Sequence, residues 1–313
     1  MKIAFLFPGQ GSQFPGMGLD LARQYPIARQ TFEQADEAVG FALSTLCFEG
    51  PEEDLRRTEN TQPALVATSI AALRVLQQLG VPAPTLVAGH SLGEYSALVA
   101  AGSLDFADAL RLVRKRGQYM QEAVPVGVGA MAAILKMPAE ALDRVLADAA
   151  QGEIVTAANL NSPDQIVIAG HKGAVERAME LAKAAGAKRC IALPVSAPFH
   201  SPLMRPAQQR LRAELDETAF LDLQVPLINN WQAALVTTGA DARRGLFEQV
   251  PNPVRWVETV RMLAAQGIAQ TIEIGAGKVL CGLVRNIDPS IQPFNFGSPT
   301  DLNGLGAASW TRS

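Results

Sequence analysis

The feature that most constrains the fold is a short apolar run that ends at a glycine-containing turn and is followed by a helical pattern. It occurs at residues 3–7 before a turn at 8–12, at residues 85–89 before a helix from Ser91, and at residues 271–274 before a turn at 275–277. Such runs are typical of buried strands in a parallel sheet with helices packed on it. Only 6% of residues are aromatic, whereas alanine, glycine and leucine are abundant, which disfavours an all-β sandwich. We therefore expect the α/β class with a parallel sheet.

A different pattern interrupts this one between residues 125 and 197. The sequence predicts strands at 130–135, 154–160, 165–169 and 188–195, with helices at 139–149 and 174–185. This β-α-β-β-α-β order is the split βαβ pattern of a ferredoxin-like unit. We expect a large subdomain of residues 1–124 and 198–296, a small ferredoxin-like subdomain of residues 125–197 and a loose tail of residues 297–313. Helices are also expected at 63–79, 204–217 and 256–266, and another is capped by Asp105.

Composition excludes several classes of protein. With 48% apolar and 18% charged residues the chain is not disordered, and a net charge of −3 gives no reason to expect nucleic-acid binding. No apolar stretch reads as a membrane span or a signal peptide, so no membrane association is expected. The three cysteines are far apart and form no CxxC pair, which favours a reduced, cytoplasmic protein.

The strongest chemical signal is the sequence Gly-His-Ser-Leu-Gly at residues 89–93, between an expected strand and an expected helix. This is the context of a G-x-S-x-G nucleophile elbow, whose sharp turn exposes the serine hydroxyl at the sheet edge. The following helix directs its N–H groups and positive dipole end at an oxyanion formed there. A plain strand–turn–helix junction with Ser91 as the N-cap is the competing interpretation.

A nucleophilic serine needs a base, and the chain has three histidines. His90 adjoins Ser91 and is expected to point away from it, while His171 lies at the end of a strand in the small unit. His200 follows the return to the large unit, where a loop can cover the carboxyl edge of the sheet, so it is the best candidate. A surface histidine is the alternative, and no histidine pair has the spacing of a zinc site.

Two further features are ambiguous by themselves. Helical periodicity places Arg116 beside Leu112 and Met120, on the flank of an apolar stripe, where a buried guanidinium needs an anionic partner. That partner is either a carboxylate of a substrate or a local Asp or Glu. The turn at residues 9–12 is no dinucleotide fingerprint, but it could bring a backbone N–H towards Ser91. The alternative is a tight turn without a ligand.

Six motifs together carry a more specific signal. Their order along the chain is Phe7-Pro8-Gly9-Gln10-Gly11-Ser12-Gln13, Thr61-Gln62-Pro63-Ala64, Gly89-His90-Ser91-Leu92-Gly93-Glu94-Tyr95, Arg114-Lys115-Arg116-Gly117, Pro198-Phe199-His200 and Asn252-Pro253-Val254-Arg255-Trp256. From residue 2 to about residue 296 the chain resembles the malonyl-CoA:acyl-carrier-protein transacylases. It is similar to the free-standing enzymes of bacterial type II fatty-acid synthesis and to the acyltransferase domains of polyketide synthases.

The resemblance implies an α/β-hydrolase-like core with a ferredoxin-like insertion, and it implies roles for individual residues. Ser91 matches the acylated nucleophile, His200 its general base and Arg116 the arginine that binds the malonate carboxylate. The remaining matches are the backbone N–H groups of Gln10 and Leu92 for the oxyanion hole and a backbone carbonyl near Gln249 that orients the histidine in place of an aspartate. Separately, we expect Phe199 and Met120 to affect acyl selectivity, because Phe199 beside His200 should crowd a methyl branch and so favour malonyl over methylmalonyl.

The implied reaction moves a malonyl group from coenzyme A to the phosphopantetheine thiol of an acyl carrier protein, through a malonyl-serine ester and without a metal or other cofactor. Malonyl-CoA and the carrier are then the partners, and Lys183, Lys188, Arg189 and Arg205 are candidates for docking an acidic carrier. The alternatives are a serine hydrolase or thioesterase, a non-catalytic carrier-binding module, and a malonyl loader of a polyketide synthase or malonate decarboxylase system.

Overall fold

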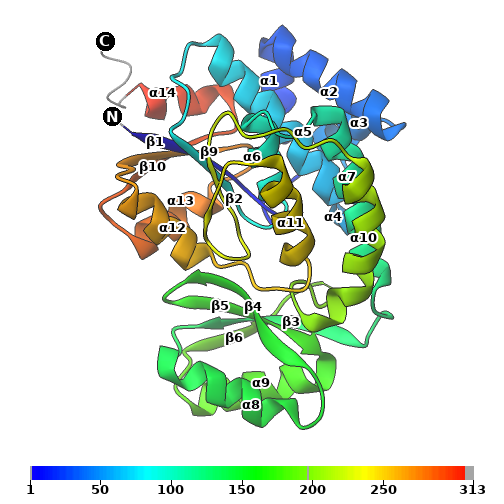
Figure 1. Ribbon diagram of the computed structural model, residues 1–313, viewed down its shortest axis with the longest axis vertical. Coiled ribbons are helices and arrows are strands. Elements are labelled where there is room, and N and C mark those ends of the chain that lie inside the picture. The colour runs from blue at the N-terminus through cyan, green and yellow to red at the C-terminus, as the bar shows by residue number, and fades with distance from the viewer. Residues whose placement is uncertain (1, 196, 307–313) are drawn as a thin grey trace.

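The structure is a computed structural model that describes residues 2–195 and 197–306. Figure 1 shows a large part, which contains strands β1, β2, β9 and β10, above a small part built on strands β3 to β6. The two sheets have six and four strands. The predicted α/β class with a parallel sheet is confirmed.

The larger sheet has the strand order β10-β9-β1-β2-β7-β8, and all its neighbours are parallel except β7 and β8. Its strands are β1 (Ile3–Phe7), β2 (Leu86–Gly89), β7 (Leu227–Ile228), β8 (Leu235–Val236), β9 (Gln270–Ile274) and β10 (Gln292–Phe296). The first, second and ninth strands are buried over their whole length, as continuous apolar runs predict for a sheet covered on both faces.

Helices cover both faces of this sheet. The first part of the chain forms α1 (Leu19–Gln24), α2 (Pro26–Val39), α3 (Leu43–Glu49), α4 (Glu52–Arg56), α5 (Thr58–Gln78), α6 (Gly93–Ala100) and α7 (Phe106–Glu122), and the last part forms the 3-10 turn η2 (Pro202–Met204), α10 (Arg205–Glu217), α11 (Gly239–Gln249), α12 (Trp256–Ala265) and α13 (Val279–Ile287). Along β1, Phe5 and Phe7 join the core that contains α5 and α7, while Leu6 joins the core of α12 and α13. This alternation is the period of two that a strand imposes.

Two predicted helices have different starts. The helix expected at 63–79 begins at Thr58, so Pro63 lies inside it rather than at its first position. The prediction was wrong because proline favours a helix start, and the five preceding residues carry no comparable signal. The helix expected from 204 begins at Arg205, after a 3-10 turn. The predicted cap by Asp105 is confirmed, because its carboxylate accepts the backbone N–H groups of Ala107 and Asp108.

The smaller sheet is antiparallel, with the strand order β4-β5-β3-β6. Its elements are β3 (Gly129–Leu135), η1 (Ala139–Ala141), α8 (Leu142–Ala150), β4 (Val155–Ser162), β5 (Gln165–His171), α9 (Lys172–Ala184) and β6 (Arg189–Ala192). The predicted β-α-β-β-α-β order is confirmed, although the last strand is shorter than the predicted 188–195. A core made only of residues from this part packs between the sheet and its two helices. We propose that this part and the rest are the two subdomains, with the predicted boundaries.

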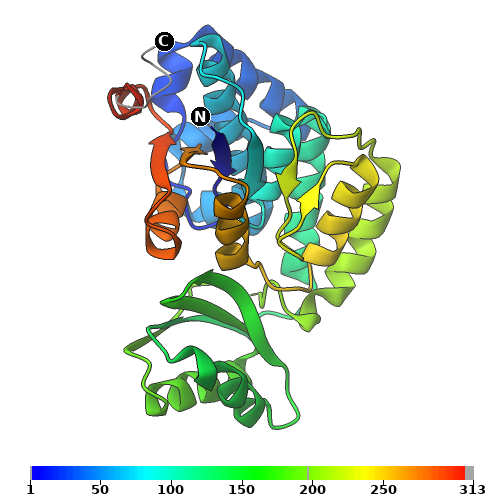
Figure 2. The ribbon, with the colours of Figure 1, turned by 60° about the vertical axis from the view of Figure 1, so that its left-hand side comes forward.

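Two contacts connect the small sheet with the large part. Strand β4 forms a parallel bridge with the loop after α11, in which Leu160 N donates to the carbonyl of Val254 and Val254 N donates to the carbonyl of Ala158, both over 2.9 Å. His90, just after β2, lies 2.8 Å from the side chain of Asn161. These contacts place the small sheet below the carboxyl ends of the parallel strands, as Figure 2 shows.

The expectation of a loose tail from residue 297 was wrong for its first part. A 3-10 turn, η3 (Pro299–Asp301), leads into the short helix α14 (Leu302–Leu305), and Leu305 is buried in the main core. Ser298 and Asp301 form a reciprocal capping box that starts this segment, so its polar residues cap a helix instead of forming a coil. Residues 307–313 lie outside the described residues. In the described parts of the chain, no helix is long and apolar enough to cross a membrane.

Candidate active site

Ser91 lies at a strained turn between β2 and α6. Its backbone has a φ of 51°, in the left-handed region that side-chain-bearing residues rarely adopt. The flanking glycines permit this turn, since a Cβ on Gly89 would lie 1.9 Å from the backbone of Gly93 and one on Gly93 would lie 2.0 Å from the Phe7 carbonyl. The predicted elbow geometry is therefore present, and Leu92 is the N-cap of helix α6, which follows the serine directly.

The structure brings Ser91 and His200 together, as the sequence predicts. Ser91 Oγ lies 2.7 Å from His200 Nε2, and the Nδ1–H of His200 donates to the backbone carbonyl of Gln249 over 3.0 Å. Burial, with a further contribution from the nearby Arg116 cation, lowers the pKa of His200 from 6.5 to about 3. The imidazole is thus neutral near pH 7, with its lone pair directed at the serine hydroxyl.

The other two histidines have different partners. His90 points away from Ser91 towards Asn161, and its ring packs against Trp256 with the centroids 5.4 Å apart. His171 accepts the backbone N–H of Ile154 through Nδ1, inside the small sheet. Both contacts agree with the choice of His200 as the candidate base.

Arg116 is buried beside the serine, and its hydrogen-bond partners are neutral. Nη1 donates to Gln62 Oε1 over 2.9 Å, while Nη2 donates to Gln249 Oε1 over 2.9 Å and to Ser91 Oγ over 3.2 Å. Within residues 2–195 and 197–306, no Asp or Glu forms a direct ion pair with it, and the one local carboxylate that acts on it, Glu94, does so across Gln249. The neighbouring Arg111 and Lys115, by contrast, pair with carboxylates on the surface. Helical periodicity within α7 could not reveal that the side chain of Arg116 points into the active-site cavity.

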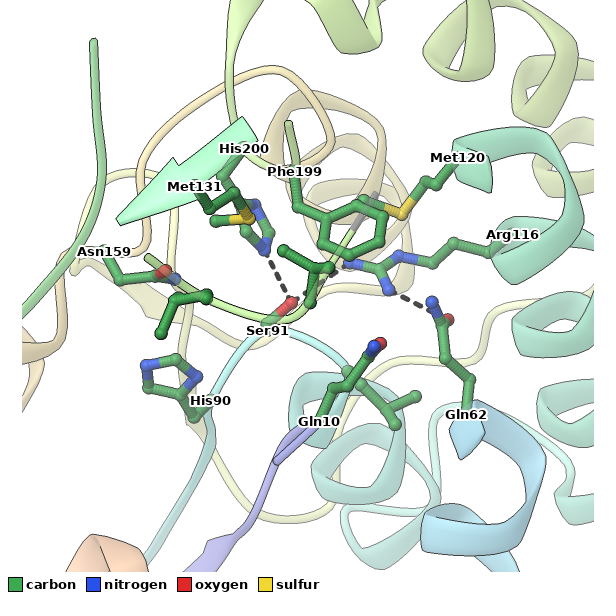
Figure 3. A pocket seen from close by; sticks show the side chains of 13 residues that line it. Gln10, Gln62, His90, Ser91, Arg116, Met120, Met131, Asn159, Phe199 and His200 are labelled. Carbon is green, nitrogen blue, oxygen red and sulfur yellow. Dashed lines mark hydrogen bonds between the residues drawn. The ribbon is translucent and has the colours of Figure 1, made fainter. Parts of the chain in front are cut away.

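A cavity of about 120 Å³ opens onto Ser91. Figure 3 shows side chains converging on it from both parts of the molecule. Its lining consists of Gln10, Gln62, His90, Ser91, Leu92, Arg116, Met120, Met131, Asn159, Leu193, Val195, Phe199 and His200. The volume is several times what one water molecule needs, and a small acyl group fits it. All the predicted site residues lie in this lining except Gln249, which contacts both His200 and Arg116 from behind.

The first glycine turn does reach the elbow. A Cβ on Gly9 would lie 2.4 Å from the carbonyl of His90, and His90 N donates to the carbonyl of Phe7 over 3.0 Å. This close backbone contact places Gln10 at the cavity next to Leu92. The assignment of their N–H groups to an oxyanion hole stays a prediction.

Sequence reasoning gave no role to several residues of the site. Gln62 belongs to a quoted motif but was not expected to hold Arg116, and the side chain of Gln249 was not foreseen as a partner of the same guanidinium. Asn159 reaches the cavity from β4, where two register shifts alter which side chains face inward. Glu94 was noticed only as part of a motif, yet it is 1% exposed and contacts Gln249. The one sequence signal for Glu94 is that it is a charged residue within a stretch that is otherwise expected to be buried.

Among the described residues, no group of three or more His, Cys, Asp or Glu side chains could hold a metal ion. The expectation that the chain needs no metal or other cofactor stays a prediction.

A serine at a strained strand–helix turn, in contact with a neutral imidazole, is the arrangement with which α/β enzymes form acyl-serine esters. The fold and the site therefore define a serine-dependent acyl-transfer enzyme. The sequence profile described as "Acyl transferase domain" matches residues 4–287, and the chain belongs to that family.

Relatives with closely similar sequences and structures agree. The malonyl CoA-acyl carrier protein transacylase of Escherichia coli K12 is 50% identical over 301 residues, which cover 96% of this chain and 97% of that protein. A crystal structure of an acyl carrier protein S-malonyltransferase from Vibrio cholerae superposes with a TM-score of 0.95 at 50% identity, covering 97% of this chain and all of the other. A complex of a type II PKS acyl-carrier protein with its malonyl-transacylase also matches with a TM-score of 0.95, at 48% identity over 98% of this chain and 99% of that one.

Proposed function

We propose that this enzyme transfers a malonyl group from coenzyme A to the phosphopantetheine thiol of an acyl carrier protein, through a malonyl ester of Ser91. The family and the names of relatives at about 50% identity support this activity over hydrolysis or non-catalytic binding. We assign this transfer to fatty-acid synthesis, as the resemblance to the free-standing bacterial transacylases implies.

The observation that carries the substrate class is the position of Arg116. Arg116 is 2% exposed, its guanidinium lies 3.2 Å from the serine oxygen, and its hydrogen-bond partners are neutral. A buried cation without an anion in direct contact is costly, and Glu94 acts on Arg116 only across Gln249, so this pocket favours an acyl group that brings its own negative charge to the guanidinium. A malonyl thioester has its carboxylate at the far end of a short acyl group, and the planar fork of arginine suits it.

In the first half-reaction Ser91 Oγ attacks the thioester carbonyl, and its proton passes to His200 Nε2. The carbonyl of Gln249 accepts from Nδ1–H and so keeps Nε2 free to receive the proton. The tetrahedral intermediate collapses as the C–S bond breaks, and His200 returns the proton to the departing thiolate of coenzyme A. The malonyl group then remains on the serine as an ester.

We assign the oxyanion of this intermediate to the backbone N–H groups of Gln10 and Leu92, which lie at the cavity beside Ser91. Leu92 is also the N-cap of helix α6, whose positive dipole end lies at the same point. Losing one such donor costs about 2.7–4 kcal/mol of transition-state stabilisation in other enzymes.

In the second half-reaction the pantetheine thiol of the carrier attacks the ester, His200 accepts the thiol proton and then protonates Ser91 Oγ. Double-displacement kinetics follow, because coenzyme A must leave before the carrier thiol enters. We assign docking of the acidic carrier to Lys183, Lys188, Arg189 and Arg205, whose side chains are exposed. Raising the salt concentration should then weaken the apparent affinity for the carrier.

Acyl selectivity is assigned to Phe199 and Met120, which line the same cavity. Phe199 adjoins His200, where a methyl branch on the acyl group would meet its ring. The reaction as written needs no cofactor beyond the coenzyme A thioester. The free thiols of Cys47, Cys190 and Cys281 suit a reducing compartment, which supports a cytoplasmic location.

Intact-protein mass spectrometry after mixing with malonyl-CoA tests the proposal. The wild type should gain one malonyl group and lose it again when holo carrier protein is added, whereas Ser91→Ala should gain none. Acetyl-CoA and methylmalonyl-CoA serve as competing donors. Release of free malonate faster than transfer to the carrier would identify a hydrolase instead.

A further inference from the structure

A buried carboxylate lies behind the active site. Glu94 belongs to the first turn of α6, three residues after Ser91, and is 1% exposed. Its Oε2 accepts two hydrogen bonds, from the backbone N–H of Asn230 over 2.9 Å and from Gln249 Nε2 over 2.8 Å. Its Oε1 is buried without a hydrogen-bond partner, near Gly245 of α11. The reaction described above makes no use of this group.

Both residues that Glu94 contacts hold the backbone of the elbow. Asn230 accepts the N–H of Ser91 through Oδ1 over 2.6 Å and donates to the carbonyl of Gly89 over 2.7 Å. Gln249 Nε2 donates to the carbonyl of Ser91 over 3.0 Å. The strained residue is therefore fixed at its N–H by one amide and at its carbonyl by another, and a single carboxylate oxygen accepts from both partners.

Gln249 also holds Arg116, and this contact requires one orientation of its side-chain amide. Arginine has only donors, so Gln249 must present Oε1 to it, and Nε2 must then find an acceptor on the opposite side. Glu94 supplies the shortest such contact, at 2.8 Å, and the carbonyl of Ser91 supplies another, at 3.0 Å. With the amide reversed, two sets of donors would face each other at Arg116, and the guanidinium would lose its position next to Ser91 Oγ (Figure 3).

We infer that Glu94 is a positioning residue for malonyl selectivity, which acts through the orientation of the Gln249 amide on Arg116 and through Asn230 on the elbow. The inference rests on the proposed function, because it concerns where Arg116 meets the malonyl carboxylate. Burial raises the pKa of Glu94 to about 7, while the hydrogen bonds from Asn230 and Gln249 and the nearby Arg116 cation favour the ionised form. The acceptor oxygen is therefore available at the mildly alkaline pH at which the test is made.

The test measures the rates of Ser91 acylation by malonyl-CoA and by acetyl-CoA at pH 8, using rapid mixing and intact-protein mass spectrometry. Glu94→Met retains the volume but removes the acceptor, and its malonyl-to-acetyl ratio should fall about tenfold or more, the effect of one hydrogen bond that involves a charged group. Glu94→Gln can offer one oxygen at the place of Oε2 and should restore most of the ratio. Glu94→Asp withdraws the carboxylate by one methylene, retains the charge, and should also lower the ratio.

Glu273→Gln is the matched control, because Glu273 is equally buried but lies in β9 and accepts the N–H of Cys281, away from the cavity. It should lower the melting temperature without changing the ratio. The inference is overturned if Glu94→Met keeps the wild-type malonyl-to-acetyl ratio. If the methionine variant does not fold, a wild-type ratio in Glu94→Asp overturns it instead. It is also overturned if Glu94→Gln shows the same lowered ratio as Glu94→Met. If the wild type itself forms no malonyl ester, the proposed function fails and the inference fails with it.

Discussion

Replacing Arg116 by methionine separates recognition of the malonyl carboxylate from the chemistry at Ser91. Methionine keeps a long unbranched stem but has no charge and no donors. The change leaves Gln62 Oε1 and Gln249 Oε1 without their donor, and it removes the contact with Ser91 Oγ. None of these losses depends on which acyl group enters the cavity.

The loss that does depend on the acyl group is large. In the Arg116→Met variant, a malonyl carboxylate would be buried opposite a thioether without a cation, and losing one partner of a buried ion pair costs about 3–5 kcal/mol. At 1.36 kcal/mol per tenfold, this corresponds to a decrease of about 150- to 5,000-fold in kcat/KM for malonyl-CoA, beyond any general effect. Acetyl-CoA has no such carboxylate and should show only the general effect. The malonyl-to-acetyl ratio should therefore fall by the same factor.

The assay compares kcat/KM for acylation of the serine by the two thioesters, followed by rapid mixing and intact-protein mass spectrometry. Arg111→Met is the matched control, since Arg111 lies on the same helix but pairs with Asp108 at the surface. Equal losses with both thioesters in Arg116→Met would refute the assignment, and the role of the guanidinium would then be to hold Ser91 or the fold.

As the pH falls, kcat/KM for acylation should begin to decrease only well below pH 6.5. The reason is that folding lowers the pKa of His200 to about 3, so the base stays neutral until the pH approaches that pKa. The acidic decrease of kcat should occur at a higher pH than that of kcat/KM. In the substrate complex, the bound malonyl carboxylate offsets the Arg116 cation, which helps to lower the pKa of His200 in the free enzyme. Phe199→Ser should raise acylation by methylmalonyl-CoA relative to malonyl-CoA, measured as the ratio of the two rates. Gly93→Ala should prevent folding or greatly lower the melting temperature, since its Cβ would lie 2.0 Å from a backbone oxygen, whereas Gly282→Ala, with open space around its Cβ on α13, should stay near the wild type.

Each of these expectations has a contrary result. An acidic limb near pH 6.5 in the free enzyme would mean that the imidazole is solvated rather than buried. An unchanged preference between the two donors in Phe199→Ser would remove that residue from acyl selectivity. Equal melting temperatures for the two glycine variants would show that the elbow relaxes to admit a side chain.

The sequence predicted the parts of the fold that depend on local patterns. Residues 3–7 and 85–89 are apolar runs that end at glycine turns, as buried parallel strands do, and the small unit followed the predicted β-α-β-β-α-β order. Strands β7 and β8 were missed because two residues each carry no periodicity, and β7 joins the sheet only through β2, far away in the chain. The segment 299–305 was missed because its capping residues are also common in coils.

The same distinction holds at the site. Ser91 could be predicted because the elbow motif consists of five consecutive residues. His200 could be predicted by excluding the other two of the three histidines. The partners of Arg116 could not be predicted from spacing, because Gln62 and Gln249 are separated from it by 54 and 133 positions. Burial of Glu94 depends on α11 and on the turn at Asn230, both of which come more than a hundred residues later.

The bridge between β4 and Val254 has a practical consequence for redesign. The loop that contains Val254 begins directly after Gln249, whose carbonyl orients the imidazole. The short segment 249–254 therefore connects strand β4, which lines the cavity, to the catalytic base. A chimaera that exchanges only the ferredoxin-like part, in order to install a different acyl preference, would break this register and misalign the base. The graft should therefore include residues 249–254 together with the exchanged sheet.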